Sequence, residues 1–285
     1  MILVADCGST KIDWGLASSA DLPCKVFTTE GVNATILSPE SLREKLILNI
    51  PREVKDATAE ISELWFYAAG CRTSRQKVSI GMALSEIFPS AAIHVDSDLI
   101  GAARSLCGHT DGIACILGTG SNSCVYSPAN GGKIIASVSP LGYILGDEGS
   151  GTAIGKSLLA DYLKGIMPEK ERELFSKFVG IDADKLIERV YRGDAPNRFL
   201  ASLARFAVAN IGSQYVESMV ENCFRIFFER NVCRLPNYNS IPIHFTGSIA
   251  AKFEPQLRTT AAHFGLTITS IVSNPLGQLV KYHLS

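Results

Sequence analysis

The sequence predicts an α/β protein with two similar halves, and two observations lead to this prediction. The first is a glycine-rich turn that occurs twice, each time between an apolar run and a second strand-like segment. The second is that each half goes on with alternating strand and helix patterns. The two turns are Asp6-Cys7-Gly8-Ser9-Thr10-Lys11 and Gly118-Thr119-Gly120-Ser121-Asn122. Together they indicate a duplicated domain.

Strands and helices follow from the apolar runs and from the residues that break them. In the first half we expect strands at 2–5, 12–16, 25–29, 64–69 and 92–95, and helices that start after Ser38 and span 78–88 and 99–106. In the second half we expect strands at 112–117, 123–126, 133–137, 241–246 and 267–272, and helices at 152–163, 169–178, within 197–234, at 254–264 and at 276–282. Ser38 is the expected N-cap of its helix, with Pro39 at the first helical position.

Three strands in a meander, followed by alternating helices and strands, are typical of a ribonuclease-H-like domain. We therefore expect one such domain over 1–104 and a second over 105–274, with a C-terminal helix at about 275–285 that packs back on the first. A ligand is expected in the cleft between the two domains.

Both turns have the chemistry of a phosphate cradle. Glycine lacks a Cβ, so successive N–H groups face an anion, and Ser and Thr hydroxyls add further donors. Asp6 ends a buried strand, where a carboxylate beside phosphates indicates an intervening Mg²⁺. Either turn alone is also typical of an ordinary hairpin, so the prediction depends on the pair.

Two other nucleotide-binding motifs are not present. Residues 150–157 approach the P-loop pattern, but Ser150 stands where glycine is required and no apolar strand leads into it. The first 40 residues contain no G-x-G-x-x-G between a strand and a helix.

The composition limits the function classes. Apolar residues make up 46% and charged residues 19%, the net charge is −1, and no Lys/Arg run exceeds two residues. We therefore expect no nucleic-acid or membrane partner. The first apolar run is too short for a signal peptide and no long apolar stretch follows, so a cytoplasmic protein is expected. The eight cysteines and five histidines show no metal-ligand spacing, so zinc or iron–sulfur chemistry is not expected.

These motifs, with Asp98 and the segments 142–150 and 245–248, resemble the sugar-kinase/Hsp70/actin superfamily with its actin-like ATPase domains. The closer resemblance is to N-acetylglucosamine kinases and the BadF/BadG/BcrA/BcrD-type ATPase family, and it spans nearly the whole chain. Gly146-Asp147-Glu148-Gly149-Ser150 is the most specific element and favours the amino-sugar kinases.

The resemblance implies an ATP-dependent kinase that phosphorylates an amino sugar, first of all N-acetylglucosamine at O6, with Mg²⁺ held by Asp6 through water. Asp98 is the implied catalytic base that takes the proton of the sugar hydroxyl. The implied contacts to ATP are Gly8, Ser9, Thr10, Lys11, Gly118, Thr119, Gly120, Gly247 and Ser248. The implied contacts to the sugar are Asn33, Asp98, Ser121, Asn122, Leu141, Gly142 and Asp147.

Several alternatives stay open. Asp96 and Asp98 both follow the strand 92–95, and either also fits a helix cap. Asn33, Asp147 and Glu148 fit turn positions, and Lys11 fits a solvated side chain as well as a phosphate contact.

Other functions and substrates also remain. An ATPase that activates or regulates a partner protein, like the dehydratase activators, is one alternative, although their cluster-binding cysteine motif is missing. A non-catalytic sugar sensor is another. Glucosamine and N-acetylmuramic acid are alternative substrates, and the resemblance leaves room for a homodimer.

Overall fold

The computed structural model describes residues 1–19, 23–32, 38–71 and 73–285, and the chain forms two compact units. Unit 1 comprises Met1–Thr110, Ser127–Ile134 and Asn274–Ser285, and unit 2 comprises Asp111–Tyr126 and Ile135–Ser273. The domain limits expected from the sequence stay a prediction.

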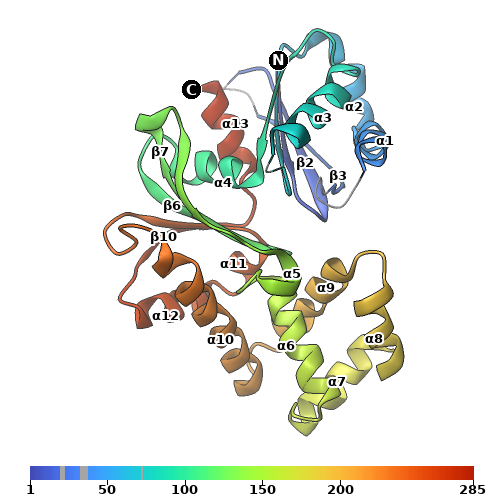
Figure 1. The fold of residues 1–285 in the computed structure, drawn as a ribbon, viewed down its shortest axis with the longest axis vertical. Coiled ribbons are helices and arrows are strands. Elements are labelled where there is room, and N and C mark those ends of the chain that lie inside the picture. Colours follow the sequence, from blue (N-terminus) through green and yellow to red (C-terminus); the bar gives the residue numbers. More distant parts are fainter. Residues whose placement is uncertain (20–22, 33–37, 72) are drawn as a thin grey trace. The chain divides into compact units, whose positions relative to one another are not determined.

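The first sheet has the strand order β3-β2-β1-β4-β5 (Figure 1). Its strands are β1 (Ile2–Cys7), β2 (Lys11–Ala17), β3 (Lys25–Glu30), β4 (Glu63–Ala68) and β5 (Ala92–Ser97). Its helices are α1 (Pro39–Asn49), α2 (Arg52–Asp56), α3 (Ser74–Ser85), α4 (Asp98–Cys107) and α13 (Leu276–Leu284), with a 3₁₀ turn at Thr58–Glu60. The first three strands are antiparallel, and β4 and β5 run parallel to β1.

Local sequence signals set the helix starts of unit 1. Ser38 accepts a hydrogen bond from the Ser41 backbone N–H, as an N-cap does, so the expected start of α1 is confirmed. Thr73 and Gln76 form a capping box, which starts α3 four residues before the expected Val78. Ser97 caps α4 by accepting from the Ile100 backbone N–H.

Consecutive residues of the central strands are apolar and their side chains point to opposite faces, so each face of this sheet carries its own core. One core joins the face of Leu3, Ala5 and Trp14 to α1, α2 and α3, and the other joins the face of Val4 and Tyr67 to α4 and α13. Figure 1 shows these two groups of helices on opposite sides of the sheet.

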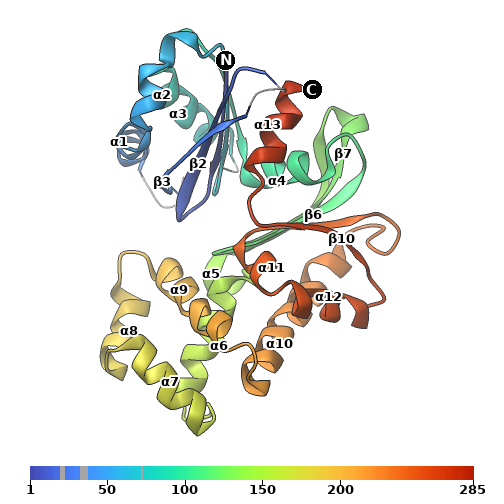
Figure 2. The same ribbon diagram turned by 180° about the vertical axis from the view of Figure 1, so that it is seen from behind.

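The second sheet repeats this topology in the order β10-β9-β6-β7-β8 (Figure 2). Its strands are β6 (Gly112–Leu117), β7 (Ser121–Ser127), β8 (Lys133–Val138), β9 (Ile243–Thr246) and β10 (Ile268–Val272). Its helices are α5 (Gly142–Leu145), α6 (Gly151–Leu163), α7 (Glu169–Val179), α8 (Ala183–Arg192), α9 (Pro196–Ala209), α10 (Gln214–Arg230), α11 (Ser248–Lys252) and α12 (Glu254–His263), with 3₁₀ turns at Pro128–Asn130 and Val232–Arg234. The matching order of both sheets confirms the predicted duplication.

One large apolar core fills unit 2, from β6 and β9 through α10 to α6 and α9. Helices α6 and α9 cross at Gly155, where a Cβ would lie 1.9 Å from the carbonyl oxygen of Leu200. Only glycine permits that approach. Within the described residues, no helix combines the length and the apolar character that a membrane span requires.

The helices of unit 2 differ in part from the prediction. The long helix expected within 197–234 is present as α10, but a separate helix, α9, precedes it, and α5, α8 and α11 were not expected. Asp182 caps α8 by accepting from the Lys185 backbone N–H at 2.9 Å. That cap was readable in the sequence, whereas α5 and α11 are too short to give a periodic pattern.

The C-terminal helix α13 is tied to the first sheet through His283. Arg104 Nη1 donates to the Tyr67 hydroxyl at 2.7 Å, and that hydroxyl lies 2.7 Å from His283 Nε2. Because arginine only donates, the Tyr67 proton points to Nε2, which must be unprotonated. The His283 ring also stacks on Trp65 with the ring centroids 4.1 Å apart. Burial, reinforced by the charges of Arg104 and His94, lowers the pKa of His283 to about 3.

We therefore expect His283 to make unfolding sensitive to acid. Its pKa is lower in the folded than in the unfolded chain, so its stabilising contribution is complete above about pH 6.5 and is lost as the pH falls towards 3. Because solvent screens the charge of this partly exposed ring, we expect the free energy of unfolding to fall by only about 2 kcal/mol. Urea unfolding at pH 7.5 and 5 should show a smaller pH effect in His283→Gln than in the wild type. His263→Gln, at an exposed position, is the control; an unchanged pH effect in His283→Gln would contradict this expectation.

Candidate functional site

The predicted site residues lie in both units, and each unit holds a distinct group of them. In unit 1 they surround the first glycine-rich turn, and in unit 2 they surround the second. Asn33 lies outside the described residues, so its predicted contact stays a prediction.

The first turn links β1 to β2 and is held closed by its own backbone. The Gly8 N–H donates to the Lys11 carbonyl at 2.9 Å, and the Gly31 N–H donates to the Thr10 carbonyl at 3.0 Å. A Cβ on Gly31 would lie 2.4 Å from both Gly8 O and Lys11 N. Gly31 therefore supports this turn, although no local sequence motif marks it as a site residue.

Three carboxylates gather beside this turn. Asp6, near the end of β1, lies directly across the antiparallel pair from Asp13 of β2. Burial, and then the negative charges of Asp98 and Asp13, raise the pKa of Asp6 to about 7, and Lys11 opposes the rise. Asp98 is thus close enough to Asp6 to affect its ionisation. A divalent cation would favour the ionised form of this group.

The structure separates the roles of Asp96 and Asp98. Ser97, and neither of the two aspartates, is the N-cap of α4. Asp96 accepts from Lys77 Nζ at 2.7 Å and from the Ser97 backbone N–H at 3.0 Å. Asp98 occupies the first turn of α4, where its Oδ1 accepts from the Leu99 backbone N–H at 2.9 Å. Asp96 is therefore bound in an ion pair, and Asp98, unlike Asp96, contributes to the raised pKa of Asp6.

The second turn links β6 to β7 and lies on the start of α6. The Gly118 carbonyl accepts from the Gly151 N–H at 2.9 Å, and the Thr119 carbonyl accepts from the Thr152 N–H at 3.2 Å and from its hydroxyl at 2.6 Å. Ser150 caps α6. The segment that approaches a P-loop in sequence therefore starts a helix that supports the second turn.

Asp147 lies against this second turn in a left-handed backbone conformation, with φ at 57°. Its Oδ1 accepts from the Ser121 backbone N–H at 3.1 Å, and a Cβ on Gly120 would lie 2.9 Å from the same oxygen. Burial raises the pKa of the Asp147 carboxyl, while the Ser121 hydrogen bond and Lys156 oppose the rise. The structure thus brings Asp147 together with Gly120 and Ser121.

The neighbouring Glu148 is engaged elsewhere. Its carboxylate lies 3.5 Å from Arg230 Nη1 and accepts from Asn231 Nδ2 at 3.3 Å. Both partners stand at the end of α10, so Glu148 anchors the loop that carries Asp147. This agrees with the interpretation of Glu148 as a residue of the turn itself.

The remaining predicted residues of unit 2 lie around the same loop and turn. Gly247 has φ at 116°, and a Cβ on it would lie 2.3 Å from the Leu117 carbonyl oxygen, directly before the second turn. Ser248 starts α11. Leu141, with φ at 55°, and Gly142, with φ at 72°, form the exposed entry of α5, and Asn122 Oδ1 accepts from the Ser123 backbone N–H at 2.9 Å.

The carboxylate oxygens beside the first turn are of the ligand type that a hydrated Mg²⁺ uses. Among the residues that the structure describes, no group of three or more acidic, histidine or cysteine side chains forms a ready cage for a metal. Mg²⁺ commonly uses one or two carboxylates, with waters and phosphates as its other ligands. Asp6, beside the first glycine-rich turn, suits that mode.

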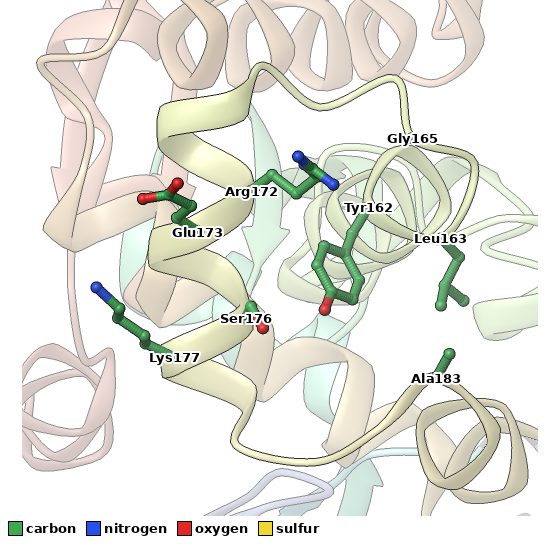
Figure 3. Close-up of a pocket in the computed structure, with 8 residues that line it drawn as sticks. All are labelled: Tyr162, Leu163, Gly165, Arg172, Glu173, Ser176, Lys177 and Ala183. Carbon is green, nitrogen blue, oxygen red and sulfur yellow. The ribbon is translucent and has the colours of Figure 1, made fainter.

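A pocket of about 600 Å³ lies among α6, α7 and α8 of unit 2 (Figure 3). It is lined by Tyr162, Leu163, Gly165, Arg172, Glu173, Ser176, Lys177 and Ala183. Figure 3 shows Arg172 directed towards Tyr162 and Lys177 directed away from it. None of the predicted site residues lines this pocket.

Comparisons with known proteins identify the family. No protein-family model matches the chain, and no curated protein matches it. Among solved structures, the "Putative N-acetylglucosamine Kinase" of Porphyromonas gingivalis is 40% identical, with a TM-score of 0.93 over 100% of this chain and 99% of that one.

More distant structures share the fold. The "Putative N-acetylglucosamine Kinase" of Chromobacterium violaceum is 17% identical, with a TM-score of 0.74 and 99% of both chains covered. A ROK family glucokinase of Streptomyces griseus, solved with glucose and AMPPNP, is 15% identical, with a TM-score of 0.52 over 99% of this chain and 97% of that one. The chain therefore belongs to the N-acetylglucosamine kinase-like family of sugar kinases, phosphotransferases with an alcohol group as acceptor, within the superfamily of actin-like ATPase folds.

Proposed function

We propose that this sugar kinase uses Mg-ATP to phosphorylate an amino sugar, N-acetylglucosamine, at O6. The observation that carries the proposal is the placement of Asp98 in the first turn of α4, within electrostatic reach of Asp6 beside the first glycine-rich turn. The amino-sugar assignment is supported by the similarity to the "Putative N-acetylglucosamine Kinase" of Porphyromonas gingivalis, which is 40% identical.

The two turns supply the contacts to the nucleotide in this proposal. The Gly8 and Gly118 N–H groups close the two turns, and the other backbone N–H groups and the hydroxyls of these turns bind the phosphates. Gly247 and Ser248 lie towards the adenosine. Asp6 would hold Mg²⁺ through water, and the ion would supply positive charge against the phosphates when bound. The tight packing of Gly31 on the first turn and of Gly247 on the strand before the second keeps both turns fixed.

The sugar contacts in this proposal include a carboxylate whose position is fixed. Asp147 is held by the Ser121 backbone N–H and by its left-handed turn, so its carboxylate is ready to accept from a sugar hydroxyl. Asn122, Leu141, Gly142 and Asp98 complete the set, and Asn33 joins it on the strength of the resemblance.

Asp98 is the general base of the proposed reaction. It accepts the proton of the O6 hydroxyl while that oxygen forms a bond to the γ-phosphorus. The bond between the γ-phosphorus and the bridging oxygen to the β-phosphate breaks, and ADP leaves. The hydrogen bond from the Leu99 backbone N–H fixes the Asp98 carboxylate in place.

The test is ADP release by the purified protein with Mg-ATP and a panel of sugars. The panel is glucose, glucosamine, N-acetylglucosamine, N-acetylmannosamine and N-acetylmuramic acid. We expect a strong rise with N-acetylglucosamine above a low rate without sugar. Steady turnover that ignores every sugar would instead favour an ATPase that regulates a partner protein, and sugar binding without turnover would favour a sensor.

A further inference from the structure

Asp13 is a buried carboxylate for which the proposed reaction has no role. It lies in β2 and is 2% exposed. Three side chains donate to it: Thr28 Oγ1 at 2.7 Å to Oδ1, Asn274 Nδ2 at 2.9 Å to Oδ2, and Lys11 Nζ to Oδ2. A carboxylate that is removed from water needs hydrogen-bond donors in place of its lost hydration. These three donors supply them to Asp13.

The orientation of this network is fixed from outside the turn. Asn274 Oδ1 accepts from the Leu276 backbone N–H at 3.0 Å, at the start of α13, while its Nδ2 donates to Asp13. Because a carboxylate only accepts, this pair of contacts sets the orientation of the amide. Thr28 of β3 holds the other carboxylate oxygen. Asp13 is thus held by Thr28 of the neighbouring strand and by Asn274, which lies two residues before α13.

Lys11 is the one member of the network that belongs to the first turn. Its carbonyl closes the turn with the Gly8 N–H, and its side chain is 55% exposed although its ammonium is bound to Asp13. A free lysine side chain loses rotamer entropy when a ligand orders it. The bond to Asp13 orders Lys11 beforehand. An ammonium has three N–H donors, so one bond to Asp13 does not exhaust it.

We propose that Asp13 is a positioning residue that, braced by Thr28 and Asn274, holds the Lys11 ammonium at the first turn for the phosphates of ATP. This inference rests on the proposed use of Mg-ATP. It resolves the alternative left open for Lys11 in favour of a phosphate contact. Asp13 does not itself touch the substrate, so its effect must pass through Lys11.

The test is a double-mutant cycle read as KM for Mg-ATP and as kcat. We expect Lys11→Met and Asp13→Asn each to raise the KM for Mg-ATP about tenfold, the size expected for a charge-assisted hydrogen bond, with a much smaller change in kcat. The double variant should bind Mg-ATP no more weakly than Lys11→Met alone, because both changes remove one contact. Asp56→Asn, an exposed carboxylate in unit 1 paired with Arg52, is the matched control and should change neither constant.

Additive effects of the two substitutions, or an unchanged KM in Asp13→Asn, would overturn the inference. If Asp13→Asn does not fold, Thr28→Val and Asn274→Ala replace it. Each substitution should raise the KM for Mg-ATP about threefold when made in the wild type and should leave it unchanged when made in Lys11→Met. If neither Thr28→Val nor Asn274→Ala raised this KM in the wild type, the inference would be overturned.

The same variants, studied by Mg-ATP binding, distinguish a failure of this inference from a failure of the proposed function. Calorimetric titration of Mg-ATP measures binding without any sugar. If the wild type binds Mg-ATP but transfers no phosphoryl group to any sugar, the proposed function fails, and the Kd values of the variants still decide the role of Asp13.

Discussion

Replacing Asp98 with asparagine is expected to lower kcat for the sugar about 100- to 10,000-fold, the range typical of a lost general base. An amide retains the shape of the side chain and an oxygen that accepts from the Leu99 backbone N–H. What it loses is the ability to take the proton of the attacking hydroxyl. The KM for Mg-ATP should change little, because Asp98 is not among the proposed phosphate contacts. Steady-state kinetics with the preferred sugar measures both constants.

Asp96→Asn is the matched control for this result. Asp96 stands two residues away and is bound to Lys77 at 2.7 Å, so its loss breaks an ion pair at the end of β5. We expect a much smaller loss of kcat and a modest loss of stability. Full activity in Asp98→Asn together with a large loss in Asp96→Asn would show that the base is Asp96.

Replacing Gly247 with alanine is expected to disrupt the second turn. The residue has φ at 116° and ψ at 160°, a backbone conformation that L side chains rarely adopt. The added Cβ would lie 2.3 Å from the Leu117 carbonyl oxygen and 3.2 Å from the Gly118 nitrogen, both of them backbone atoms. Relief of this clash must shift the chain at the entry of the turn. We expect about 3 kcal/mol of lost stability and a large rise in the KM for Mg-ATP.

Gly212→Ala serves as the comparison in the same unit. A Cβ there meets no atom within 4 Å, so neither stability nor ATP use should fall. Urea unfolding and initial-rate kinetics measure the two effects. If Gly247→Ala kept both wild-type values, the tight packing of this glycine on β6 would have no bearing on nucleotide use.

The topology was predictable because most strands of both sheets contain a short apolar run bounded by glycine, proline or polar residues. The repeated order of strands then followed from the repeated turn. The helical part of unit 2 was less predictable. Its α8 is short and largely exposed, and the break between α9 and α10 falls at Asn210–Ser213, where only one glycine interrupts the pattern.

The candidate site was predictable as a set of residues but not as a set of contacts. The turns and Asp98 were visible as motifs, because each follows an apolar strand. The partners of these residues come from distant segments: Gly31 supports the first turn, Lys77 binds Asp96, and Asn274 reaches Asp13 across 261 positions of the chain. Such pairings depend on the register of strands and the docking of α13, which no local pattern records.

The measurement that tests the central claim most directly is identification of the product formed from Mg-ATP and N-acetylglucosamine. Correlated phosphorus–proton NMR of the reaction mixture shows which carbon bears the transferred phosphate. The proposed function predicts one new phosphomonoester whose phosphorus couples to the two protons on C6, with ADP formed in equal amount. Unmodified sugar beside ADP and inorganic phosphate, or a phosphate on a different oxygen, would contradict it.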